Sequence, residues 1–148
     1  MDILNDAVKA VTDAVSGLWP EPSEKPGLVD GKLRPCPGTP NCVCSDYPGS
    51  QDWVEPVSFD RMSSGDAWEA LKKIIVDMGG SVQSEEKEYL WATFTVPLFG
   101  FVDDVEFRLD KPGNVIQVRS ASRLGFSDLG VNRSRVDDLR RRFAGKGS

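Results

Sequence analysis

The stretch "VDDVEFRLDKPGNVIQVRSAS", residues 102–122, determines the fold class of this chain. Apolar and charged residues alternate in its first half, with Val105, Phe107 and Leu109 set against Asp104, Glu106 and Arg108. A period of two predicts a strand that turns one face toward a core. The "KPGN" at 111–114 is a turn signal. Residues 102–109 and 115–121 are therefore expected to pair as an antiparallel hairpin.

The segments before and after this hairpin complete a small domain. Residues 81–86 and 89–96 also read as strands, and the chain before them has the apolar spacing of a helix that Ser63 or Ser64 can cap and Gly79-Gly80 can end. A last helix is expected to start after Asn132, a good N-cap residue. The pattern predicts an α+β domain, in which an antiparallel meander of about four strands is flanked by two helices.

The N-terminal third has a different character. Residues 1–19 show the spacing of an amphipathic helix, which either packs on the domain or acts as a peripheral or oligomerising arm. Residues 20–35 are linker-like, with four prolines and two glycines, and they lead into a loop rich in cysteine and proline. The domain itself is predicted over 36–143, followed by a frayed tail at 144–148.

Composition and charge restrict the class of function. The chain of 148 residues has a net charge of −5, yet residues 1–110 carry −11 and residues 111–148 carry +6. It contains no histidine, the residue most often used as a general base, which argues against an enzyme. The net negative charge also argues against nucleic-acid binding. Neither a signal peptide nor a membrane-spanning stretch is visible in the sequence, so the compartment stays open.

The end of the last strand carries the candidate site. Ile116 and Val118 share a strand face that continues into Ser120 and Ser122, so the buried side changes from apolar to hydroxyl-bearing. Arginines and a helix start follow closely, a combination that favours a carboxylate or phosphate ligand. The candidate ligand-binding residues are Arg119, Ser120, Ser122, Arg123, Ser127, Asp128, Asn132 and Arg133. The same residues could instead brace the loop, for example through an Arg123–Asp128 ion pair.

Carboxylates suggest an alternative function. Asp103, Asp104 and Asp128 are the acids and bases available to a small hydrolase or a metal-dependent enzyme. Asp104 and Glu106 share one strand face and form a weak candidate metal site. A solvated or arginine-paired face is the preferred explanation for Asp104 and Glu106.

Three cysteines lie in one turn-rich loop. Cys36 and Cys42 are separated by five residues, two of them proline, so a disulfide can close a small loop there. Cys44 would then be left over. Zinc binding is disfavoured because three thiolates lack a fourth ligand. In a reducing compartment, all three cysteines would be ordinary thiols.

Three blocks of this sequence resemble a known family. They are "CPGTPNCVCS" (36–45), "TVPLFGFVDDVEFRLD" (95–110) and "QVRSASRLGFSDLGVNRSRVDDLR" (117–140), and they are similar to the family catalogued as domain of unknown function 1499. The resemblance implies bacterial or plastid proteins, often exported or membrane-anchored, with no established reaction. The family motif has serine where this chain has Cys44, which supports a Cys36–Cys42 pair. The remaining matched positions are Pro40, Asn41, Phe99, Gly100, Phe101, Asp103, Asp104, Glu106, Arg119, Ser120, Ser122, Arg123, Gly125, Ser127, Asp128, Gly130, Asn132 and Arg133.

The sequence thus predicts a non-enzymatic binding or accessory domain that needs no cofactor. Its expected partners are an anionic small molecule, a lipid head group or an acidic protein segment. Any membrane association would be peripheral.

Overall fold

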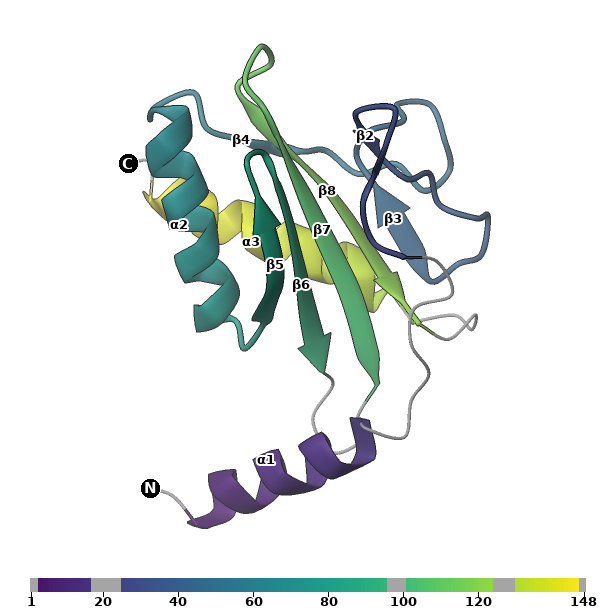
Figure 1. Cartoon of the computed structure of the whole chain (residues 1–148), viewed down its shortest axis with the longest axis vertical. Coiled ribbons are helices and arrows are strands. Elements are labelled where there is room, and N and C mark those ends of the chain that lie inside the picture. The colour runs from purple at the N-terminus through teal and green to yellow at the C-terminus, as the bar shows by residue number, and fades with distance from the viewer. Residues whose placement is uncertain (1–2, 17–24, 96–100, 124–129, 147–148) are drawn as a thin grey trace.

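A computed structural model describes residues 3–16, 25–95, 101–123 and 130–146 of the chain (Figure 1). Three helices and eight strands form in these ranges. The helices are α1 (Ile3–Ser16), α2 (Ser64–Asp77) and α3 (Val131–Lys146). The strands are β1 (Leu28–Val29), β2 (Lys32–Leu33), β3 (Cys42–Cys44), β4 (Val57–Ser58), β5 (Ser81–Glu86), β6 (Tyr89–Thr95), β7 (Val102–Asp110) and β8 (Val115–Ser122).

The α+β class predicted from sequence is confirmed, but the main sheet has six strands. Its order is β3-β8-β7-β6-β5, and β4 also pairs with β8, with every pairing antiparallel. The outer edge of β8 is shared, because β4 pairs with residues 115–116 and β3 with residues 119–121. Strands of two or three residues are too short to show a periodic sequence pattern. The sequence therefore predicted about four strands, and this number was too low. A separate hairpin, β1-β2, forms at 28–33, inside the stretch expected to be a linker.

One face of the sheet carries the main core. The apolar residues of β6, β7 and β8 that share a face pack in one cluster with α2 and α3, and α3 crosses behind the strands in Figure 1. Val136, Leu139 and Phe143 of α3 contribute to this cluster and are buried. Part of the other face, over β7 and β8, is covered by the chain between β1 and β4, which adds a smaller cluster around Leu33, Cys44 and Tyr89.

The helix ends agree with the sequence at α2 and differ at α3. Ser63 caps α2 by accepting a hydrogen bond from the backbone N–H of Asp66 at 3.1 Å, as its spacing predicts. Helix α3 begins at Val131, directly after Gly130, whose φ is +82°. Asn132 therefore lies inside the first turn rather than at the N-cap, and its side chain binds β8 and the segment before β3 instead.

Candidate functional site

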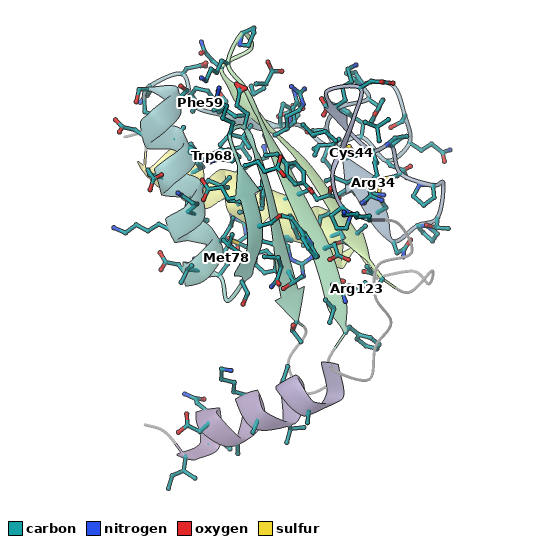
Figure 2. All side chains as sticks on the ribbon, in the orientation of Figure 1. Arg34, Cys44, Phe59, Trp68, Met78 and Arg123 are labelled. Carbon is teal, nitrogen blue, oxygen red and sulfur yellow. A yellow bond between two sulfur atoms is a disulfide. The ribbon has the colours of Figure 1, made fainter. Side chains whose placement is uncertain are left out.

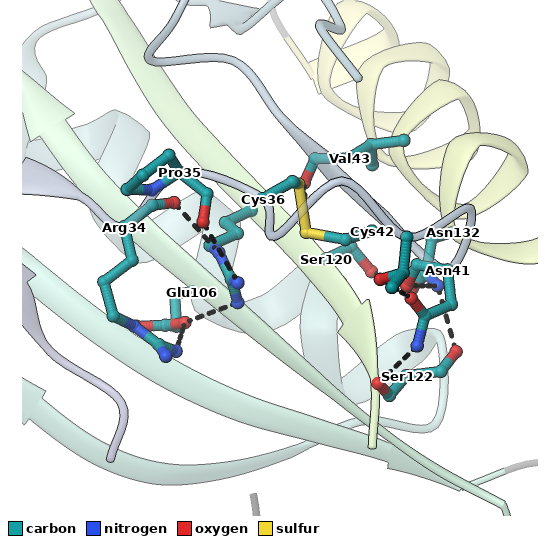
Figure 3. The surroundings of a disulfide bond; sticks show 12 residues. Arg34, Pro35, Cys36, Asn41, Cys42, Val43, Glu106, Ser120, Ser122 and Asn132 are labelled. Carbon is teal, nitrogen blue, oxygen red and sulfur yellow. Dashed lines mark hydrogen bonds and ion pairs between the residues drawn. A yellow bond between two sulfur atoms is a disulfide. The ribbon is translucent and has the colours of Figure 1, made fainter. Parts of the chain in front are cut away.

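The side chain of Asn132 joins α3 to the end of the sheet. It is fully buried, accepts a hydrogen bond from the Ser120 hydroxyl at 2.5 Å and donates to Ser122 Oγ at 3.1 Å. It also donates to the backbone carbonyl of Asn41 at 3.0 Å (Figure 3). The Asn41 side chain in turn donates to the Ser122 carbonyl, and the Asn41 carbonyl accepts from the Ser122 N–H. Three distant segments, at β3, β8 and α3, are thereby held together.

An arginine of α3 joins these polar side chains on the sheet face that packs against the helix. Arg135 forms an ion pair with Asp103 at 2.8 Å and donates to Asn132 Oδ1 at 3.0 Å. Its guanidinium also lies 4.9 Å from the centre of the Phe94 ring, a cation–π contact. These residues, together with those of the preceding paragraph, form the helix-side cluster: Asn41, Asp103, Ser120, Ser122, Asn132 and Arg135.

A second polar group occupies the opposite face of the same strands. Glu106 is 0% exposed and binds Arg34 at 2.8 Å and Arg119 at 3.5 Å. It also accepts hydrogen bonds from the hydroxyl of Tyr89 at 2.7 Å and from the N–H of Gly27 at 3.0 Å. Burial, followed by the adjacent Glu106 charge, raises the pKa of Tyr89 far above its ordinary value, so this phenol is a permanent donor.

Asp104 lies on the same face as Glu106 and extends this polar group toward the end of the sheet. It accepts two hydrogen bonds from Arg123, at 2.9 and 3.1 Å, and one from the indole N–H of Trp91 at 2.9 Å. Arg34 and Arg123 both lie along this side of the strands (Figure 2). These residues form the loop-side cluster: Arg34, Tyr89, Trp91, Asp104, Glu106, Arg119 and Arg123.

The structure divides the predicted site residues between the two clusters. Ser120, Ser122 and Asn132 meet on the helix side, whereas Arg119 and Arg123 lie on the loop side because neighbouring strand residues point to opposite faces. Ser127 and Asp128 lie outside the described residues. Arg133 is exposed, and its only described hydrogen bond is to the carbonyl of Trp53, at 3.3 Å.

The carboxylates proposed for catalysis are also separated. Asp103 binds Arg135 on the helix side and Asp104 binds Arg123 on the loop side. Asp104 and Glu106 share a face, but each has its own arginine partners. Among the described residues, no three histidine, cysteine or acidic side chains are grouped so that they could hold a metal ion.

Sequence reasoning missed Arg34, Tyr89 and Arg135. Arg34 lay in a stretch read as a linker, and its contact with Glu106 spans 72 residues, so no local pattern could reveal it. Arg135 follows Asn132 by three residues on α3, a spacing that places both on one helix face. That spacing was the one available signal for its contact with Asn132.

The disulfide predicted between Cys36 and Cys42 is present, with a Cα–Cα distance of 5.7 Å (Figure 3). It closes the loop that ends in Asn41, so it restrains the residue that holds the helix-side cluster. Just before Cys36 in the chain, the backbone carbonyl of Arg34 accepts a hydrogen bond from Arg119 Nε at 2.9 Å.

Cys44 is free and buried, and burial raises the pKa of its thiol to about 11. Such a thiol is a poor nucleophile at neutral pH.

A cavity of about 360 Å³ opens at the other end of the molecule. Phe59, Met62 and Phe143 form its apolar lining, and Ser58, Asp60, Arg61 and Ala144 complete it. The cavity does not adjoin either polar cluster.

No helix within the described ranges is both long and apolar enough to cross a bilayer.

Comparison with known proteins gives one match. No curated protein and no solved structure matches the chain significantly. A family model described as "Protein of unknown function (DUF1499)" matches residues 32–143, about three quarters of the chain, and this range includes every residue of both polar clusters. The chain therefore belongs to the DUF1499 family.

Proposed function

We propose that this chain is a non-enzymatic binding domain that attaches peripherally to membranes, with Arg133 binding the anionic head group of a lipid. The observation that carries the proposal is the charge balance at the end of β8. Arg119, Arg123 and Arg135 are each neutralised by a carboxylate of β7. Arg133 is exposed and forms no ion pair with any residue that the structure describes.

Exposed apolar side chains support a lipid rather than a soluble anion. Val131 is on the first turn of α3, two residues before Arg133, and Phe101 directly precedes β7; both are exposed. The backbone N–H of Arg123 bonds to the carbonyl of Val102, next to Phe101, and Asn132 contacts Ser122, so both apolar residues belong to the same end of the sheet. An arginine at the same end of the sheet as exposed apolar side chains suits the boundary between head groups and acyl chains.

The two polar clusters have a supporting role in this proposal. Their hydrogen bonds and ion pairs fix α3, β3 and β8 relative to one another, so the position of Arg133 is set before a ligand arrives. Preorganisation of this kind lowers the entropy cost of binding. Ser120 and Ser122, which the sequence nominated as ligand donors, act instead by holding Asn132.

Vesicle flotation tests the proposal. The chain should float with vesicles of phosphatidylglycerol and phosphatidylcholine and float less with phosphatidylcholine alone. Arg133→Gln should weaken binding to the anionic vesicles roughly fivefold, since one arginine near an anionic surface contributes about 1 kcal/mol. Arg141→Gln is the matched control, because it removes the same charge from an exposed position further along α3.

Two results would overturn the proposal. One is an absence of flotation with either vesicle composition. The other is an equal loss in Arg133→Gln and Arg141→Gln, which would reveal a diffuse charge effect without a site. If vesicles fail but inorganic phosphate shifts the Arg133 side-chain NMR signal, the partner is a soluble anion and the membrane assignment is wrong.

A further inference from the structure

Helix α1 exposes more apolar surface than the other helices described. Ile3 is 90% exposed, Leu4 74% and Val11 48%. The helix lies at the end of the sheet, apart from the layer formed by α2 and α3 (Figure 1). An isolated helix of this length is only marginally stable in water, so its apolar surface needs a partner.

The exposed side of α1 has a regular spacing. Thr12 is buried and Val8 is half-buried, so the rest of the chain covers one side of the helix. Leu4, Ala7, Val11 and Ala14 remain exposed, and we call them the α1 stripe. Their separations alternate between three and four residues, as in a heptad whose 3.5-residue repeat keeps a seam facing a second helix.

The order of side chains within the stripe points to a specific partner. Large and small residues alternate along it, as Leu4, Ala7, Val11 and Ala14. If a second α1 lies antiparallel, Leu4 faces Ala14 of the other copy and Ala7 faces Val11. Each layer then joins one large and one small side chain, the condition for close packing of two helices. In a parallel pair, by contrast, alanine would face alanine and leave gaps.

Charge favours a second copy over a lipid surface. Helical periodicity places Asp6 and Lys9 away from the stripe, so no charge would be buried between two copies. Helices that lie on membranes usually carry a row of basic residues beside the apolar face. Within α1, Lys9 is the single basic residue, and Asp6 and Asp13 outweigh it.

We propose that the α1 stripe pairs with the α1 stripe of a second copy of this chain, in an antiparallel and two-fold symmetric contact. Such a contact uses the same surface on both copies and closes on itself, so it yields a dimer rather than a filament. Two short helices bury little area, so the dimer belongs to the weak, concentration-dependent class. The proposal is independent of lipid binding by Arg133.

Disulfide cross-linking tests the arrangement directly. In an antiparallel pair a cysteine at position 4 approaches position 14 of the other copy. A mixture of the Leu4→Cys and Ala14→Cys chains should therefore form a cross-linked dimer on mild oxidation. Either variant alone should not, because its two cysteines would lie near opposite ends of the helix pair. Asp6→Cys, mixed with Ala14→Cys, is the control on the opposite side of α1. The native cysteines should not interfere, since two are bonded and Cys44 is buried.

Sedimentation velocity tests the dimer without cross-linking. The full chain should shift from monomer to dimer with rising concentration, and Val11→Glu should raise the dissociation constant roughly tenfold or more, because it places a charge in the contact. Asp6→Glu is the matched control and should leave the dissociation constant unchanged. A chain that stays monomeric at millimolar concentration overturns the proposal. So does self-linking of Leu4→Cys alone, or a Val11→Glu variant that loses vesicle binding but keeps the dimer.

Discussion

Glu106 is the most heavily bonded carboxylate of the loop-side cluster, and it is fully buried. Glu106→Gln keeps the shape of the side chain but leaves Arg34 and Arg119 without the carboxylate that neutralises them. Breaking a buried charge pair on one side costs about 3–5 kcal/mol. We expect urea unfolding to show a loss of that size. Glu88→Gln, which removes an exposed partner 3.8 Å from Lys111, should cost less than about 1 kcal/mol. Similar losses in both variants would contradict the assignment of Glu106 as a structural charge.

Cys44 gives a prediction about pH. Its folded pKa of about 11 lies above that of an ordinary thiol, so the folded state holds the proton more firmly than the unfolded state does. Stability from this group is complete below about pH 8.5 and is lost as the pH rises toward 11, since the unfolded chain releases the proton first. A thiol reagent at pH 8 should accordingly label Cys44 only after denaturation. Rapid labelling of the native chain would show that the thiol is not enclosed.

At this scale the sequence pattern selected polar residues at the end of the sheet but not their partners. Arg123 and Ser122 were selected, yet the expected partner of Arg123 was Asp128, its neighbour along the chain. The structure pairs it with Asp104, 19 residues away, because the register of β7 with β8 sets Asp104 opposite Ala121. Local spacing contains no information about register between strands. Ion-pair partners across a sheet were therefore beyond the reach of the sequence.

At the scale of elements, Gly80 connects α2 to β5 at a close approach. A Cβ added there would lie 2.6 Å from the Phe94 ring and 2.9 Å from Ile75, so one of them must move. Gly80→Ala should lower stability by about 1–3 kcal/mol, the usual cost of overpacking a core. Gly65→Ala is the control within α2, where a Cβ meets nothing within 4 Å. Since alanine favours a helix over glycine, this control should gain up to about 1 kcal/mol. Thermal unfolding of both variants should show shifts of opposite sign.

The disulfide acts on a neighbouring element through Asn41. Replacing Cys36 and Cys42 with serine should cost about 2–3 kcal/mol for a loop of this size. Because Asn41 holds Ser122 and Asn132, the loss should extend to the start of α3, and hydrogen exchange should quicken there before it does in α2. Reductant should shift the melting temperature of the native chain to that of the double variant and leave the variant unchanged. Unaltered exchange at α3 would show that Asn41 stays in place without the bond.

Long elements were predicted well and short ones were not. Strand β5 was predicted with its observed bounds, and β7 and β8 were predicted to within a residue at each end. In β7 and β8 the alternation of apolar and polar residues is a strong signal. Strands β1 to β3 escaped prediction. They have two or three residues each and exist because β8 or a neighbouring turn holds them in place. The start of α3 was misplaced because Asn132 fits an N-cap as well as a buried bridge.

At the scale of the whole molecule, the charge asymmetry of the sequence has a structural meaning. Four arginines of the basic part, residues 111–148, form ion pairs with carboxylates of the acidic part, residues 1–110. The pairs are Arg119–Glu106, Arg123–Asp104, Arg135–Asp103 and Arg140–Glu55. The carboxylates of the first three pairs are buried, so salt should screen these pairs little. Four of the nine basic residues in 111–148 thus help to dock β8 and α3 on the body of the domain. Arg133 differs from these four arginines because it binds the body through the carbonyl of Trp53 and has no carboxylate partner among the described residues.

Truncation tests where the folded unit begins. Residues before Lys25 include α1, which lies apart from the sheet, so a chain starting at Lys25 should unfold within a few degrees of the full chain. A chain starting at Cys36, the predicted start of the domain, also loses Leu33 and Arg34. Leu33 is fully buried and its backbone binds Asp46 and Tyr47, while Arg34 binds Glu106. Burial of leucine contributes about 2–3 kcal/mol, and the uncompensated Glu106 adds to the loss. We therefore expect the shorter chain to melt well below the longer one, or not to fold at all. Equal melting temperatures would show instead that the domain begins at Cys36 and that the β1-β2 hairpin contributes nothing to its stability.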